Sequence, residues 1–166
     1  MSGTLYLVAT PIGNLEDITL RAIKVLNNAD LVLAEDTRNS KKLFAKHLIK
    51  TPLSAYHDFS SERKTQSIIK LLKNGKIIAL VSDAGTPLIS DPGFELVRKA
   101  IKENIKIYSI PGPSSVISGL ITSGFNNNRF IFEGFLPRKS SDLKKIVTSF
   151  KYESRTIILF ESPKRI

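Results

Sequence analysis

Residues 76–104 read KIIALVSDAGTPLISDPGFELVRKAIKEN, and this stretch decides the fold. It begins with a continuous apolar run of strand length, KIIALV, and it ends with apolar residues at helical spacing in PGFELVRKAIKEN. Between the two lies SDAGTPLISDPG (82–93), which contains two glycines, two prolines and two aspartates. An apolar strand followed by a helix is typical of a parallel sheet that is covered on both faces.

The same strand–loop–helix unit repeats through most of the chain. Further apolar runs predict strands at 5–9, 30–36, 52–57 and 106–112. Helical patterns are expected at 16–30, 39–50, 61–75 and 92–104. Ser40 is the expected N-cap of the second of these helices, and Gly75 is the expected C-cap of the third. We therefore predict an α/β fold built on a five-stranded parallel sheet.

The pattern changes after Pro111-Gly112-Pro113, because two prolines around a glycine cannot continue a strand ladder. We place a domain boundary here, between an N-terminal α/β domain (1–111) and the first part of a second α/β domain (112–166). The second part is expected to form a helix, a strand, a polar loop and another strand at 113–125, 129–135, 136–142 and 156–162. A unit of this size is marginal alone, which predicts a truncated chain or one that relies on a partner.

Composition narrows the class of protein. The net charge is +10 and the pI is about 9.9, which favours a polyanionic partner, although a lysine-rich solvated surface explains the same excess. The absence of cysteine excludes disulfides and thiolate chemistry, and it makes the cytoplasm the default location. The apolar runs are too short to span a bilayer, and the start MSGTLYLVAT lacks the basic region of a signal peptide.

Ligands of open parallel sheets bind beyond the carboxyl ends of the strands. The loops expected at that edge are 10–14, 35–38, 57–62, 82–93 and 111–115. The 82–93 loop is either a tight turn or a rigid wall that lets a flat ligand approach the main chain. EDTR (35–38) is either a helix entry capped by Thr37 or Asn39, or an acid/base and phosphate-binding cluster.

Several familiar chemistries lack their motifs. No dinucleotide-binding or P-loop glycine pattern occurs, and no metal-ligand spacing is present. The two histidines differ in context: His47 lies in a helical pattern and is interpreted as structural, whereas His57 lies at a strand end and is a candidate substrate contact.

Six loop motifs, in order, resemble those of the ribosomal RNA small subunit methyltransferase I family, which belongs to the tetrapyrrole-methylase-like class of S-adenosylmethionine enzymes. They are TPIGNLEDIT (10–19), LAEDTR (33–38), LVSDAGTPLISDPG (80–93), PGPSS (111–115), FEGFLPRK (132–139) and FESPKRI (160–166). The resemblance runs from residue 4 to the last residue. SDAGTPLISDPG and FEGFLPRK are its most specific motifs, whereas tetrapyrrole methylases in general share PGPSS.

This resemblance implies 2′-O-methylation of the ribose of a decoding-region cytidine in 16S rRNA (cytidine 1402 in the family), with S-adenosylmethionine as the methyl donor. It also implies two α/β domains, commonly in a homodimer, and no metal. The donor-binding residues carried over by motif position are Ile12, Ala84, Gly85, Thr86, Ile89, Ser114, Ser115, and Phe160 or Glu161. The family usually has a histidine where this chain has Lys164, and its second domain continues beyond the matching segment.

A ribose hydroxyl is a poor nucleophile, so a carboxylate is expected to accept its proton. The candidates at strand ends are Asp36, Glu35 and Asp83. The expected contacts to RNA are Arg38, His57, Arg138 and Lys139, since arginine binds phosphate in a bidentate manner. Two alternatives remain open: a small-molecule methylase that acts on a tetrapyrrole, and a truncated module that binds RNA or donor without catalysis.

Overall fold

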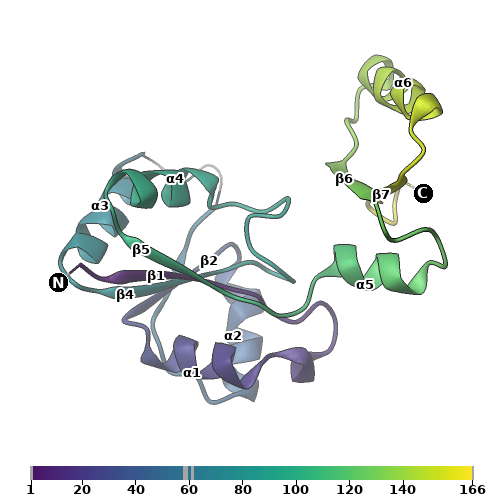
Figure 1. The fold of residues 1–166 in the computed structure, drawn as a ribbon. Coiled ribbons are helices and arrows are strands. Elements are labelled where there is room, and N and C mark those ends of the chain that lie inside the picture. Colours follow the sequence, from purple (N-terminus) through teal and green to yellow (C-terminus); the bar gives the residue numbers. More distant parts are fainter. Residues whose placement is uncertain (1, 58–59, 61, 166) are drawn as a thin grey trace. The chain divides into compact units, whose positions relative to one another are not determined.

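The computed structural model describes residues 2–57, 60 and 62–165, and it confirms the α/β class (Figure 1). The chain divides into two compact units, Met1–Ser114 and Ser115–Ile166. The strands of the first unit are β1 (Thr4–Val8), β2 (Leu31–Ala34), β3 (Leu53–Ala55), β4 (Ile77–Val81) and β5 (Lys106–Ile110). Its helices are η1 (Leu15–Asp17), α1 (Leu20–Asn28), α2 (Thr37–Lys46), α3 (Glu62–Lys73) and α4 (Phe94–Lys102).

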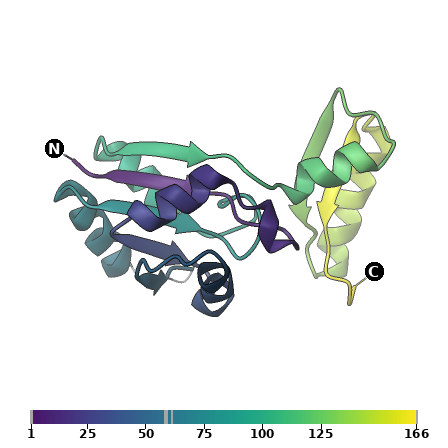
Figure 2. The ribbon, with the colours of Figure 1, turned by 90° about the horizontal axis from the view of Figure 1, so that it is seen from below.

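The five strands of the first unit form one sheet in the order β3-β2-β4-β1-β5, and all of its pairs are parallel. Helices α1 and α2 cover one face of this sheet, and α3 and α4 cover the other (Figures 1 and 2). The central strand β4 is buried on both sides, because Ala79 and Val81 face one apolar cluster while Ile78 and Leu80 face the other. The continuous apolar pattern of KIIALV is explained by this double burial.

The helix starts differ from those expected. The first predicted helix is split, because η1 precedes α1, and the side chain of Thr19 caps α1 by accepting the N–H of Ala22. The expectations that Ser40, or else Thr37 or Asn39, caps the second helix are wrong. The cap of α2 is Asp36, whose carboxylate accepts the N–H of Arg38, and Ser40 is buried inside the helix. Gly75 follows α3 in a left-handed conformation with φ +87°, as its predicted role requires.

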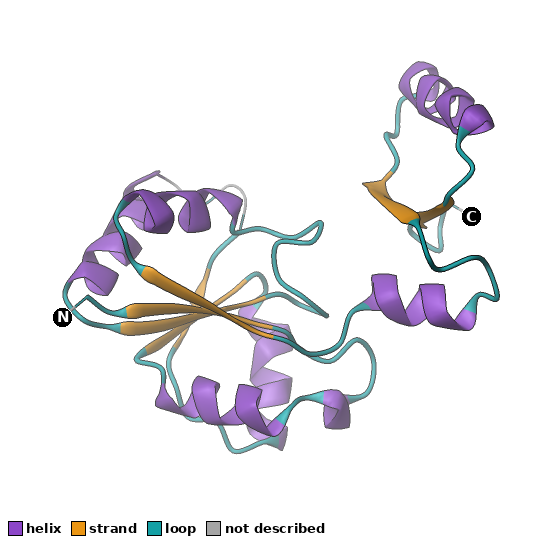
Figure 3. Cartoon of the chain, in the orientation of Figure 1, coloured by secondary structure: helices purple, strands orange, loops and turns teal. Residues whose placement is uncertain are grey.

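The second unit contains a β-α-β segment that follows a helix. Its elements are α5 (Ser115–Thr122), β6 (Phe130–Phe135), α6 (Ser140–Ser149), η2 (Phe150–Tyr152) and β7 (Thr156–Phe160). The two strands pair in parallel, and the rings of Phe132 and Phe160 meet edge to face with centroids 4.8 Å apart. The predicted polar loop 136–142 is too long, since its last three residues already belong to α6. Figure 3 shows this helix joined by loops to the two strands of the unit.

Gly93 makes a testable contribution to the stability of the first unit. It has φ +129°, and a Cβ at this position would lie 2.6 Å from Cδ2 of the buried Leu80. Gly93→Ala is therefore expected to lower the free energy of unfolding by about 2 kcal/mol, through backbone strain and overpacking. Urea unfolding followed by circular dichroism measures this loss.

The clash with Leu80 can be separated from the backbone strain at Gly93. In a Leu80→Val background the same Gly93→Ala change is expected to cost about 1 kcal/mol less, because a shorter side chain relieves the contact. Equal costs in the two backgrounds would show that the contact with Leu80 is not the cause.

Candidate active site

The carboxyl ends of β1, β4 and β2 lie at one edge of the sheet, and the chain leaves these strands in different directions. The segments after β1 and β2 lead to α1 and α2 on one face, whereas the segment after β4 leads to α4 on the other. Because β4 lies between β2 and β1, the loops separate above it. Crevices of this kind are where open α/β sheets bind ligands.

Backbone and side-chain hydrogen bonds join three of the predicted donor-binding loops within the first unit. Thr10 and Gly85 form an antiparallel bridge, in which each N–H donates to the other residue's carbonyl at 2.9 and 3.0 Å. The Thr86 hydroxyl donates to the carbonyl oxygen of Pro113 at 3.2 Å. A Cβ placed on Gly85 would lie 3.2 Å from Cγ2 of Ile12. The structure therefore brings Ile12, Gly85 and Thr86 together around one short backbone bridge.

The 82–93 loop has an unusual backbone. Besides Gly85 and Gly93, the non-glycine residues Leu88 and Ser90 adopt positive φ, at 73° and 59°. Such conformations cost about 1–3 kcal/mol each and concentrate at ligand-binding sites. In this loop Ala84 is exposed and Ile89 leaves 43% of its surface exposed, so the loop offers an apolar wall. This backbone favours the ligand-wall interpretation of the loop over a simple turn.

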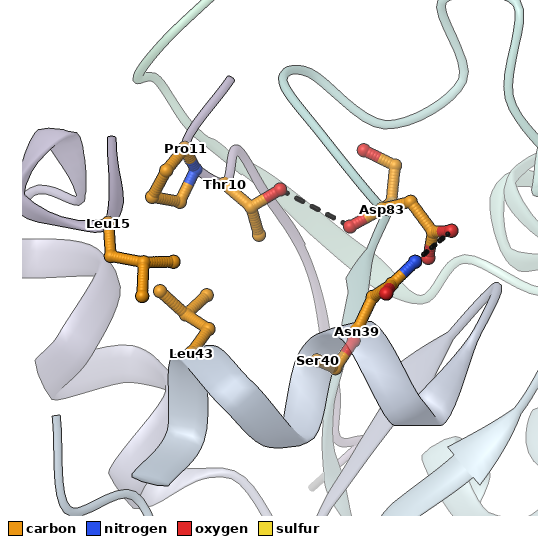
Figure 4. Close-up of a pocket in the computed structure, with 8 residues that line it drawn as sticks. Thr10, Pro11, Leu15, Asn39, Ser40, Leu43 and Asp83 are labelled. Atoms are coloured by element: carbon orange, nitrogen blue, oxygen red, sulfur yellow. Dashed lines mark hydrogen bonds between the residues drawn. The ribbon is translucent and has the colours of Figure 1, made fainter. Parts of the chain in front are cut away.

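A small pocket lies beside this wall, between the first loop and the start of α2 (Figure 4). Its lining residues are Thr10, Pro11, Leu15, Asn39, Ser40, Leu43, Ser82 and Asp83. Pro11, Leu15 and Leu43 group on one side, and Asp83 and Asn39 lie on the other. The cavity volume of about 50 Å³ admits a few water-sized groups, so the pocket can accept a hydroxyl or the edge of a ring but no whole nucleoside.

Asp83 is held by two N–H donors from the start of α2. The backbone N–H of Asp36 donates to its Oδ1 at 3.0 Å, and the Asn39 amide donates to its Oδ2 at 2.9 Å. Each carboxylate oxygen thus keeps lone-pair capacity for a further donor. Because Asp83 is exposed at the pocket and oriented on both oxygens, it is well placed to accept a hydrogen bond from a bound hydroxyl.

The neighbouring Asp36 has a different environment. Arg38 binds its carboxylate in a bidentate manner, with Nη2 to Oδ2 at 2.6 Å and Nε to Oδ1 at 3.0 Å. These side-chain bonds, together with the backbone N–H of Arg38, lower the pKa of Asp36 to about 2. A proton acceptor works best when its pKa is near the working pH, so the structure disfavours Asp36 in that role and makes it a helix cap.

The other predicted site residues are placed as follows. Glu35 is half-buried at the end of β2, before Asp36. The carboxylate of Glu161 accepts its neighbour's N–H (Ser162, 2.7 Å) and pairs with Arg165 at 3.3 Å, so it is already engaged in the second unit. Phe160 packs on Phe132 and belongs to the apolar face of β7.

Ser114 ends the first unit and Ser115 begins α5. Of the predicted RNA contacts, Arg138 and Lys139 are exposed just before α6, and His57 is exposed after β3. Residues 58, 59 and 61 of the predicted 57–62 loop lie outside the described residues. His47 ends α2 and its Nε2 lies 2.9 Å from the carbonyl oxygen of Leu15, which agrees with a structural role.

The sequence predicts two of the segments that line the pocket, the loops 10–14 and 82–93, but it misses the contribution of α2. It offers Asn39 only as a helix cap, and it gives Ser40 and Leu43 no role at a site. A helical wheel of 37–46 could have placed Asn39, Ser40 and Leu43 on one side, but the side that faces the 82–83 segment is set by tertiary packing.

Comparisons with known proteins agree with this architecture. The family model described as Tetrapyrrole (Corrin/Porphyrin) Methylases matches residues 4–166, so the sheet and its loops are those of this class. Two solved structures share the fold at low sequence identity. A diphthine synthase matches 98% of the chain and 66% of its own length with a TM-score of 0.73 at 16% identity. A cobalt precorrin-4 methyltransferase matches 95% of the chain and 68% of its own length with a TM-score of 0.70 at 21% identity.

Within that class, the chain belongs to the ribosomal RNA small subunit methyltransferase I family. The relative of that name from Thermotoga maritima is 49% identical over 164 residues, which are 99% of this chain and 73% of the relative. Those from Synechocystis and Haemophilus influenzae are 50% and 48% identical over 99% and 100% of this chain. The chain spans 59% of the length of each of these two relatives.

Proposed function

We propose that this chain carries the donor-binding half of an S-adenosylmethionine-dependent rRNA methyltransferase, which methylates the 2′-hydroxyl of a decoding-region cytidine in 16S rRNA. One observation carries the proposal. The loops 10–14, 82–93 and 111–115 meet around the Thr10–Gly85 bridge, and the pocket beside this bridge contains the oriented carboxylate of Asp83. Relatives named ribosomal RNA small subunit methyltransferase I supply the substrate class.

The residues at the bridge fit a flat, partly apolar donor. Gly85 is packed at the bridge, where even a Cβ would lie 3.2 Å from Cγ2 of Ile12, and Ile89 exposes apolar surface on the same loop. We infer that Ile12, Ala84, Gly85, Thr86 and Ile89 hold the donor in the first unit. Ser114, Ser115, and Phe160 or Glu161 stay predictions from the family motifs. When bound, S-adenosylmethionine supplies a methyl group on a sulfonium centre, which a nucleophile can attack.

The part of the reaction that the chain performs itself is to orient a hydroxyl and receive its proton. A hydroxyl in the small pocket would lie against Asp83, whose oxygens are fixed by Asp36 and Asn39. A fixed acceptor keeps the hydroxyl in one geometry, and alignment of this kind lowers reaction barriers by several kcal/mol. Asp83 is therefore our candidate proton acceptor, ahead of Glu35 and Asp36.

Other features fit this proposal. The net charge of +10 suits a polyanionic substrate. No helix among the described residues is long and apolar enough to cross a membrane. No group of three or more candidate metal ligands occurs in the described part of the chain. We propose a cytoplasmic enzyme that acts on 16S rRNA or the small ribosomal subunit and forms a homodimer.

A methyl-transfer assay tests the substrate class. The chain is incubated with radiolabelled S-adenosylmethionine and either an RNA fragment of the decoding region, the same fragment with a 2′-deoxycytidine at the target, or a porphyrinoid. We expect label only in the unmodified RNA. Label in the porphyrinoid would favour the tetrapyrrole alternative, and label in the deoxy fragment would exclude the ribose hydroxyl as the acceptor.

Calorimetry with the donor alone separates catalysis from binding. A chain that binds S-adenosylmethionine but transfers no methyl group to any acceptor would support the alternative of a non-catalytic binding module. The same measurement on a full-length relative, such as the one from Thermotoga maritima, would then show what the remaining length adds.

A further inference from the structure

The outer face of helix α2 carries a concentrated positive charge. Its ten residues, TRNSKKLFAK, include Arg38, Lys41, Lys42 and Lys46 and no acidic residue. Leu43 and Phe44 turn inward to the core, and the four cations are exposed on the other side of the helix. Arg38, Lys42 and Lys46 follow one another at intervals of four residues, so they form a row along the helix, with Lys41 beside it.

The charges on this face are only partly neutralised. Arg38 binds Asp36, and Lys46 lies 3.9 Å from Glu16 at the margin of an ion pair. Lys41 and Lys42 form no ion pair within residues 2–57, 60 and 62–165. The face therefore presents at least two cations that have no acidic partner in this described part of the chain.

Helices α3 and α4, on the opposite face of the sheet, carry both paired and unpaired cations among the described residues. On α3 and α4, Lys73 pairs with Glu103, Arg98 with Glu95, and Lys99 with Glu62. Cations and acids are thus interleaved on that face, as on an ordinary solvated surface. The two faces therefore differ in composition and not in the presence of unpaired cations: α2 contains no acidic residue, whereas α3 and α4 contain Glu62 and Glu95.

The basic face also adjoins the candidate active site. Asn39, Ser40 and Leu43 of the same helix line the small pocket, and Lys42 is close enough to Asp36 to help lower its pKa. In a parallel α/β unit the start of a helix lies at the carboxyl edge of the sheet, so Lys41 and Lys42, in the middle of α2, lie about one helical turn from the edge where the target hydroxyl would enter.

We propose that the outer face of α2, defined by Lys41, Lys42 and Lys46, binds the phosphate backbone of the RNA that flanks the target nucleotide. This inference rests on the proposed function. It adds a surface to the RNA contacts that the motifs predict. It also makes Arg38 a weaker candidate for an RNA contact, because its guanidinium is already bound to Asp36. Phosphate contacts of this kind position the substrate without reading its sequence.

Matched charge variants test the surface. Lys41→Gln/Lys42→Gln removes two cations from the α2 face, and Lys70→Gln/Lys102→Gln removes two exposed, unpaired cations from α3 and α4 within the described residues. Affinity for a fluorescent decoding-region RNA hairpin is measured by anisotropy across a range of salt concentrations, and donor affinity is measured by calorimetry. Each phosphate contact contributes about 0.7–0.9 to the slope of log affinity against log salt.

The α2 variant is expected to flatten this slope by about 1.5 and to keep the donor affinity of the wild type, whereas the α3/α4 variant keeps the wild-type slope. Equal slopes for the two variants would overturn the α2 surface and leave the proposed function intact. A wild-type chain that binds the donor but shows no salt-dependent RNA binding would overturn both. Reduced donor affinity in the α2 variant alone would assign the lysines to the donor site and also contradict the proposal.

Discussion

Replacement of Gly85 by leucine is expected to weaken binding of S-adenosylmethionine by at least about 100-fold, which corresponds to about 2.7 kcal/mol. Gly85 stands at the bridge between the first and fourth loops, and a Cβ at its position already approaches Cγ2 of Ile12 to 3.2 Å and the carbonyl oxygen of Pro113 to 3.7 Å. Because Gly85 is buried, a leucine side chain must displace Ile12 or the neighbouring loop segments that we assign to the donor. The displaced groups then no longer fit the ligand.

A control must separate this steric effect from backbone strain. Gly85 has φ +82°, which any L-residue adopts at a cost of about 1–2 kcal/mol. Gly124 has a similar φ of +73°, and nothing lies within 4 Å of its Cβ position. Gly124→Leu thus imposes a comparable strain in the second unit, and it is expected to keep the donor affinity of the wild type.

Calorimetric titration of both variants with S-adenosylmethionine, after circular dichroism has shown that each is folded, gives the comparison. Donor affinity that survives in Gly85→Leu would remove the 84–89 wall from the donor site. Equal losses in the two variants would point to a general loss of structure in place of a local block.

The fold was accessible from sequence because its pattern is local and repeated. KIIALV is apolar at every position after its lysine, and only a strand covered on both faces requires this. The loops at the carboxyl edge follow directly from that assignment, since all parallel strands end at the same edge. The predicted cluster of Ile12, Gly85 and Thr86 is thus a consequence of topology.

The remaining features depend on contacts between distant segments. Asp36 is a candidate base by sequence because it follows a buried strand, and only the fold shows that Arg38 and the helix start occupy its carboxylate. The sequence does not predict Asn39 as a site residue, because its hydrogen-bond partner, Asp83, lies 44 positions away along the chain. The order of the strands decides which side chains meet at the edge of a sheet, and no local pattern in a single sequence reveals that order.

Substitution of Asp83 by asparagine is expected to reduce the rate of methyl transfer by about 10²–10⁴-fold, which is the usual contribution of general acid–base catalysis. The change preserves shape. The oxygen of the new side-chain amide can accept the N–H of Asp36, and its NH₂ group can donate to Asn39 once the Asn39 amide turns over, so both hydrogen bonds are kept. The variant loses negative charge and basicity but retains the two hydrogen bonds that hold this side chain at the pocket.

Asp36→Asn is the matched control for this experiment, because it also removes one negative charge, and it does so at the residue whose backbone N–H donates to Asp83. Its oxygen can still cap α2, and the wild-type carboxylate, with a pKa of about 2, is a weak base. Single-turnover rates with decoding-region RNA and saturating S-adenosylmethionine should therefore fall far more in Asp83→Asn than in Asp36→Asn, while donor affinity stays constant in both. A wild-type rate in Asp83→Asn would exclude this carboxylate as the acceptor, and a larger loss in Asp36→Asn would transfer the role to Asp36. Because the two carboxylates share one hydrogen-bonded network, only the difference between their rate losses assigns the proton, and neither variant does so alone.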